Sequence, residues 1–122
     1  KKNFKKKIIL IYRFVDSTLA YQHYGMGVDI KFIKTINNFL LKNIKVNFTF
    51  LNLVNQKNMQ KRLSARKKLN RYDKFTDVFY KKVQNGFLNI AKQNPNKYMK
   101  IDSNLNIIKN KKIILNKLIN LI

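Results

Sequence analysis

The sequence has no cysteine and a single histidine, His23. Disulfide bridges and thiolate metal sites are therefore excluded, and a histidine-rich metal centre lacks its ligands. A nucleophilic triad is also disfavoured, since it needs a histidine beside a serine or cysteine at a built site. This composition is compatible with a reducing cytoplasm, and it predicts no metal ligands.

Glycine is scarce too: Gly25, Gly27 and Gly86 are the only three. A phosphate-cradling loop of the form G-x-x-x-x-G-K-[ST] needs glycines whose amides can face a triphosphate. None of the three is followed by lysine and a hydroxyl residue at that spacing. The dinucleotide-binding pattern also fails, because Ile30 stands where its third glycine belongs. Residues 1–122 therefore hold no ATP-cradling loop.

Acidic residues are few, with 5 against 27 lysines and arginines, which gives a net charge of +22. All five acids are aspartates, and asparagine, isoleucine and lysine crowd every segment. An AT-rich coding bias would produce this composition on any surface. A surface selected to bind anions is the alternative, and a basic module that binds nucleic acid through phosphate contacts is one form of it.

Apolar residues make up 45% of the chain, enough for the core of one domain or part of one. Three short apolar runs are predicted strands, at 8–12, 48–53 and 98–101. The first is continuous and β-branched at two positions, as in a strand covered on both faces. It is too short for a signal-peptide core or a membrane span.

Helical spacing or capping residues predict five helices between and after these runs, at 17–24, 29–41, 55–66, 72–92 and 105–122. The longest carries an apolar stripe that should be core: Phe75, Phe79, Val83, Phe87 and Ile90. Strands that alternate with helices predict a parallel α/β sheet with helices on both sides. Three strands are few for such a sheet, so we expect an incomplete α/β domain.

Arg13 follows the first predicted strand, and Asp16-Ser17-Thr18 offers N-cap chemistry for the next helix. In an α/β sheet, the crevice beyond a strand's carboxyl end is where ligands bind. A guanidinium there can fork two phosphate oxygens, while hydroxyl groups add donors. The residues alone thus leave two readings open: a phosphomonoester pocket, or an ordinary capped helix beside a solvated arginine.

The run from Tyr12 to Gln22 reads Tyr-Arg-Phe-Val-Asp-Ser-Thr-Leu-Ala-Tyr-Gln, and a Gly-x-Gly-x-Asp turn ends at Asp29. Together they closely resemble the signature of the thymidylate (dTMP) kinases. The likeness implies a P-loop nucleoside-monophosphate kinase fold, truncated at its N-terminus, with residues 1–122 as the C-terminal part of a single domain. Further matches follow in the family's order, at 30–34, 37–39, 48–51, 66–73, 86–91 and 98–103.

The resemblance implies a pocket for dTMP. Arg13 should bind its phosphate, while Ser17 and Thr18 sit at the monophosphate pocket with Thr18 toward the thymine edge. Tyr21 and Gln22 should line the sugar and base, with Tyr21 disfavouring a 2′-hydroxyl. The competing interpretation of Tyr21 is that it is a packing residue.

The resemblance also implies a lid over residues 62–74, in which Arg66 and Arg71 would neutralise charge during phosphoryl transfer. Solvated charges are the alternative for these two arginines. Asp102 and Ser103 match a turn beside the adenine of ATP. The implied reaction is ATP + dTMP to ADP + dTDP, in a cytoplasmic enzyme that commonly forms homodimers. Both ATP and Mg²⁺ would require the missing N-terminal part.

Five positions depart from the family's pattern. Tyr12 stands where an acid usually precedes the arginine, and that acid lies near the phosphates and metal. Met26 replaces a common arginine, His23 a glycine, and Asn52 and Asn70 replace aspartates. Without the phosphate loop we expect this chain alone to be an incompetent kinase. A degenerate or split-gene product and, less favoured, a nucleic-acid-binding module are the alternatives.

Overall fold

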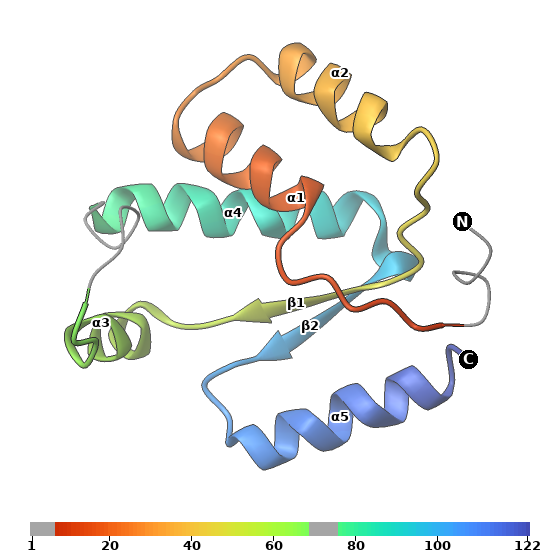
Figure 1. Cartoon of the computed structure of the whole chain (residues 1–122). Helices are drawn as coiled ribbons and strands as arrows, with labels where there is room; N and C mark the ends of the chain where they lie inside the picture. The colour runs from red at the N-terminus through yellow and green to blue at the C-terminus, as the bar shows by residue number, and fades with distance from the viewer. Residues whose placement is uncertain (1–6, 69–75) are drawn as a thin grey trace.

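The computed structural model describes residues 7–68 and 76–122 of the chain (Figure 1). Helix α1 is short and continues directly into a π-helix, η2, and a 3₁₀ turn, η4, precedes the second strand. The elements in chain order are α1 (Val15–Thr18), η2 (Leu19–Gly25), α2 (Ile30–Leu41), β1 (Thr49–Leu53), α3 (Gln56–Ser64), α4 (Asp77–Gln93), η4 (Pro95–Lys97), β2 (Tyr98–Asp102) and α5 (Ile107–Ile119).

The two strands pair in parallel, with Thr49 opposite Tyr98 and Leu53 opposite Asp102. Two parallel strands need a crossover connection, and α3 and α4 supply it. In Figure 1, α1, α2 and α4 lie on one side of the strands and α5 lies on the other. The predicted parallel α/β arrangement is confirmed for the strands at 48–53 and 98–101.

The predicted strand at 8–12 is wrong, because the structure has no strand there. Its side chains are exposed, from 54% at Ile9 and Ile11 to 89% at Tyr12. A strand forms only where a neighbour satisfies its backbone amides and carbonyls. Within the described residues the only ladder joins β1 to β2, so this row has no strand beside it and its faces are not covered.

The five predicted helices are found with shifted ends, although residues 72–75 of the fourth lie outside the described part. Side-chain oxygens cap four of them, those of Asp29, Asn55, Thr76 and Asn106. Each accepts a hydrogen bond from a first-turn amide that has no partner inside its helix.

The predicted capping by Asp16, Ser17 and Thr18 is wrong. Helix α1 begins earlier, at Val15, so Phe14 takes the N-cap position and no side chain caps the helix. Asp16 therefore lies inside the first turn, where a carboxylate still favours the positive helix end.

The core joins η2 to α4. Five residues form it: Ala20, Tyr21, Phe79, Val83 and Ile90. This confirms the apolar stripe predicted for α4, of which Phe75 lies outside the described residues. By contrast, α5 has no buried residue and α2 buries only Ile33.

Two glycines let η2 and α4 approach closely. A Cβ on Gly25 would lie 2.6 Å from Phe79 Cε2, and one on Gly86 would lie 2.7 Å from Tyr24 Cδ2 and 2.8 Å from Tyr24 Cβ. Real Cβ atoms do not approach that closely, so the contact between these helices requires residues without side chains.

Gly86→Ala should therefore destabilise the fold, although alanine is the better helix former. We expect the free energy of unfolding to fall by about 1–2 kcal/mol, since overpacking outweighs the gain in helix propensity. Urea unfolding followed by circular dichroism measures it. Asn85→Ala, at the exposed neighbouring position, is the matched control and should be neutral or stabilising. A Gly86→Ala protein as stable as the wild type would contradict the packing argument.

Candidate functional site

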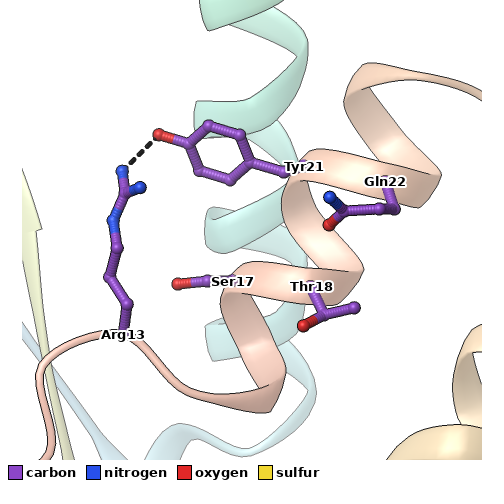
Figure 2. Close-up of a pocket in the computed structure, with 5 residues that line it drawn as sticks. All are labelled: Arg13, Ser17, Thr18, Tyr21 and Gln22. Carbon is purple, nitrogen blue, oxygen red and sulfur yellow. Dashed lines mark hydrogen bonds between the residues drawn. The ribbon is translucent and has the colours of Figure 1, made fainter. Parts of the chain in front are cut away.

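One hollow of about 140 Å³ is lined by five side chains from two successive turns and the segment before them. Figure 2 shows these residues around it: Arg13, Ser17, Thr18, Tyr21 and Gln22. We call it the Arg13 hollow. All five are residues that the sequence resemblance assigned to substrate binding, and the structure brings them together.

Arg13 is the one non-glycine residue among the described positions with a positive φ, at 62°. The left-handed conformation costs an L-residue about 1–2 kcal/mol. Its guanidinium donates a hydrogen bond to the Tyr21 hydroxyl and lies 4.7 Å from the centroid of that ring. Figure 2 shows the arginine reaching from its loop toward the tyrosine. The left-handed backbone at Arg13 and the contact with Tyr21 thus hold the Arg13 guanidinium beside the hollow.

Tyr21 connects the hollow to the core. Its side chain is 8% exposed, and its ring meets Phe79 and Phe87 edge-on at centroid distances of 6.0 and 6.3 Å. Such aromatic pairs contribute about 0.5–1.5 kcal/mol beyond their buried area. Its hydroxyl end faces Arg13 instead. Tyr21 is therefore a packing residue and a lining residue at once, so the two interpretations of it are compatible.

The π-helix shapes this wall. The Met26 amide donates to the Tyr21 carbonyl at 3.1 Å, five residues back, where an α-helix would bond four back. Such π-helical turns occur frequently at functional sites. Nothing in the spacing of the apolar residues distinguishes a π-helix from an α-helix, so the sequence did not predict it.

The chemistry of the Arg13 hollow suits a small anion with polar neighbours. One guanidinium, two hydroxyl groups, a phenol and a carboxamide line it. A guanidinium matches the paired oxygens of a phosphate or carboxylate. Across residues 7–68 and 76–122, no three His, Cys, Asp or Glu side chains gather as a metal-binding group.

Asp16 has a role that sequence reasoning missed. Its carboxylate accepts a 2.6 Å hydrogen bond from the Tyr98 hydroxyl, which ties α1 to the first residue of β2. Helix α1, which carries Ser17 and Thr18 of the hollow, is thus tied to the amino end of β2. The crevice expected at a strand's carboxyl end is not found beside Arg13, because residues 8–12 form no strand. The sequence carries no signal for this pair, whose members lie 82 residues apart.

Burial raises the pKa of the Tyr98 hydroxyl far above its ordinary value, and the hydrogen bond to the Asp16 carboxylate and that carboxylate's charge raise it further. In the unfolded chain the phenol ionises near pH 10. The proton thus stays on the folded protein longer than on the unfolded one. The protonated Tyr98 hydroxyl therefore contributes its full stabilisation of the folded state below pH 10. This stabilisation is lost as the pH rises toward the folded pKa.

Tyr98→Phe should lower the free energy of unfolding by about 1 kcal/mol at pH 8, since it leaves Asp16 without this donor. Above pH 10 the difference between wild type and variant should shrink, because only the wild type can ionise at this position. Urea unfolding at several pH values between 8 and 11.5 measures both effects. Tyr12→Phe, at a side chain that is 89% exposed, is the control and should match the wild type throughout. A constant difference across this pH range would contradict the account.

The turn after η2 depends on His23. Its Nδ1 lies 2.8 Å from the Val28 carbonyl oxygen, which can only accept, so Nδ1 carries the proton. Gly27 in the same turn has φ at +77°. His23 is therefore a turn-stabilising residue here, and neighbouring Met26 is 40% exposed.

The other predicted site residues do not line the Arg13 hollow. Asp102 ends β2, and its Oδ1 accepts from the Asn104 amide at 2.9 Å. The Ser103 amide donates to the Leu53 carbonyl at 2.7 Å, which ties the turn to the end of β1. Arg66 follows α3, exposed, and Arg71 lies outside the described residues.

Fold and hollow together define an α/β protein with an arginine-bearing polar pocket. Its own sequence then places it among known proteins: the family model for thymidylate kinase matches residues 1–114, so the chain belongs to the thymidylate kinase family, as a C-terminal part of it. That confirms the resemblance drawn from Arg13 to Asp29. The family is one of kinases with the P-loop kinase fold, and the small parallel sheet is consistent with it.

Three curated relatives illustrate the likeness. A thymidylate kinase of Sulfurihydrogenibium sp. (strain YO3AOP1) is 36% identical over 111 residues, 91% of this chain and 53% of the relative. One of Staphylococcus epidermidis (strain RP62A) is 33% identical over 99 residues, 80% and 49% of the two chains. One of Wolbachia sp. subsp. Brugia malayi is 36% identical over 93 residues, 76% and 43%. The chain thus spans about half the length of the relatives it matches.

No helix in the described part of the chain is long and apolar enough to cross a membrane.

Proposed function

We propose that this chain carries the dTMP-binding part of a thymidylate kinase, which transfers the γ-phosphoryl group of ATP to dTMP and yields ADP and dTDP. The observation that carries the proposal is the Arg13 hollow, where five residues of the family signature surround one small space. A solvated arginine beside an ordinary helix would not need the left-handed backbone found at Arg13.

The phosphate of dTMP binds to the Arg13 guanidinium in this proposal. The guanidinium has five N–H donors and gives one to the Tyr21 hydroxyl, so others remain for phosphate oxygens. The hydroxyl groups of Ser17 and Thr18 add donors, with Thr18 toward the thymine edge. Gln22 lines the base, and Tyr21 excludes a 2′-hydroxyl from the sugar.

At about 140 Å³ the hollow is smaller than common small-molecule sites, which span about 300–1,000 Å³. It can enclose only part of a nucleotide. We propose that the rest of the site, including the ATP-cradling loop, belongs to the half of the relatives that this chain does not span. The chain is then a truncated piece of the P-loop fold and is inactive by itself.

Mg²⁺ does not fit the residues present. Tyr12 replaces an acid, and the part of the chain that the structure describes holds no cluster of three potential ligands. We propose that Mg²⁺, like the ATP-cradling loop, depends on the half of the relatives that this chain does not span. For ATP we propose that the turn at Asp102 and Ser103 lies beside the adenine.

The lid is proposed for residues 62–74, with Arg66 and Arg71 stabilising the charge of the transferring phosphoryl group. Helix α3, whose last residues overlap the proposed lid, makes two contacts here: Arg62 donates to the Ser103 carbonyl, and Gln60 donates to Asp77 at 2.7 Å. The Arg62 contact links the proposed lid to the proposed adenine side. A cytoplasmic location and a homodimer are further proposals that rest on the family alone.

Ligand selectivity tests the dTMP pocket. By equilibrium dialysis, dTMP should bind at least tenfold more tightly than thymidine, which lacks the phosphate, and more tightly than the ribose analogue of dTMP. A chain that binds thymidine and dTMP equally would refute the pocket.

Phosphoryl transfer is tested by a second experiment. The chain mixed with the N-terminal half of the Sulfurihydrogenibium relative should convert dTMP to dTDP when given ATP and Mg²⁺, while the chain alone should not. Turnover by the chain alone would contradict the proposal. Selective dTMP binding without turnover in the mixture would favour a degenerate product.

A further inference from the structure

A second hollow, of about 340 Å³, lies where both strands begin, beside α5. Figure 1 shows α5 running below the strands, on the side away from α1 and α4. The lining residues are Phe48, Pro95, Asn96, Tyr98, Met99 and Lys117. We call it the Lys117 hollow. It shares no lining residue with the Arg13 hollow.

Its charge has one sign. Among the residues that the structure describes, Lys117 is the only ionisable one in the lining besides Tyr98, and no carboxylate lines the hollow. The Tyr98 hydroxyl is committed to Asp16, and burial raises its pKa, so it stays neutral and protonated. A ligand that enters this space therefore meets the positive charge of Lys117.

Its walls include an aromatic ring and a thioether beside the polar Asn96. The Lys117 Nζ lies 5.1 Å from the centroid of the Phe48 ring, and Phe48 meets Phe50 edge-on at 5.2 Å. Phe48 is thus held by its neighbour while it presents a ring next to the ammonium group. Met99 adds a polarisable thioether, which makes favourable contacts with aromatic rings. Planar rings pack well against such a surface.

From the charge and the walls we infer that the Lys117 hollow binds a small planar aromatic anion, a ring that carries a carboxylate or phosphate group. The anionic group pairs with Lys117, and the ring lies against Phe48 and Met99. Its volume is at the lower end of common small-molecule sites, so one or two fused rings fit. The thymidylate kinase proposal does not require this site, so a negative result for either proposal leaves the other unaffected.

The test uses 2-naphthoate as the probe and the whole chain. Lys117→Gln should weaken its binding about fivefold, the factor expected for a partly exposed ion pair of about 1 kcal/mol. Lys111→Gln is the matched control, because it removes the same charge from an exposed position on the same helix, and it should change little. The protein has no tryptophan, so naphthoate fluorescence can be followed with little background.

A further comparison distinguishes binding at this hollow from non-specific binding of an aromatic compound. The neutral analogue 2-naphthalenemethanol should bind more weakly to the wild type than naphthoate does, and equally to wild type and Lys117→Gln. Equal losses in the two lysine variants, or equal affinity of the wild type for naphthoate and the neutral analogue, would each overturn the inference.

Discussion

Arg13→Ala is expected to weaken dTMP binding by about 10- to 100-fold and to leave the circular dichroism spectrum unchanged. Hydrogen bonds to charged groups contribute about 1.5–3 kcal/mol, which sets that range. The side chain is exposed and donates to the Tyr21 hydroxyl at the edge of the core, so its removal leaves the core intact. Titration calorimetry with dTMP measures the loss.

Two variants sharpen this prediction. Arg13→Gly should lose as much affinity as Arg13→Ala, yet be more stable than it by about 1 kcal/mol, because glycine adopts a φ of 62° without strain. Lys31→Ala removes one positive charge from an exposed position on α2 and should bind dTMP as the wild type does. If Lys31→Ala and Arg13→Ala lost affinity equally, the general charge of the protein would be responsible, and the role of Arg13 would be wrong.

Tyr21→Ala should have the largest effect on stability. It deletes a ring that is 8% exposed and packed against Phe79 and Phe87. Removing a buried aromatic side chain costs about 3–5 kcal/mol, a large part of the stability of a small domain. We expect this variant to be largely unfolded in the absence of denaturant or at low urea, as judged by circular dichroism.

Tyr21→Phe separates packing from binding. It keeps the ring in the core, so its stability should stay within about 1 kcal/mol of the wild type. It removes the hydroxyl that holds Arg13, so dTMP should bind less tightly and discrimination against the ribose analogue should fall. If Tyr21→Phe bound both nucleotides as the wild type does, the hydroxyl would have no part in the site. A folded Tyr21→Ala protein would show that the core does not depend on this ring.

What the sequence predicted correctly depends on short-range patterns. The α4 stripe lies on one face of one helix, so the spacing of its apolar residues along the sequence is enough to predict it. The residues of the Arg13 hollow are also neighbours in sequence, while their role in binding dTMP stays a prediction. The five lining residues span only ten positions, so one loop and two helical turns suffice to gather them.

What the sequence could not predict depends on distant partners. The row at 8–12 has the composition of a buried strand, but composition does not supply the neighbouring strand that its backbone needs. Asp16 looks like a capping residue, yet its carboxylate bonds to Tyr98, far along the chain. The close contact of Gly86 with Tyr24 likewise follows from how two helices cross.

Backbone amide shifts in an NMR titration with dTMP test the central claim most directly. The account predicts that the largest shifts cluster at residues 13–22, that they saturate, and that thymidine at the same concentration produces much smaller ones. Arg13→Ala should abolish the cluster while the rest of the spectrum stays dispersed. Shifts spread over the exposed lysines of α2, α4 and α5, with the Arg13 hollow unaffected, would contradict it.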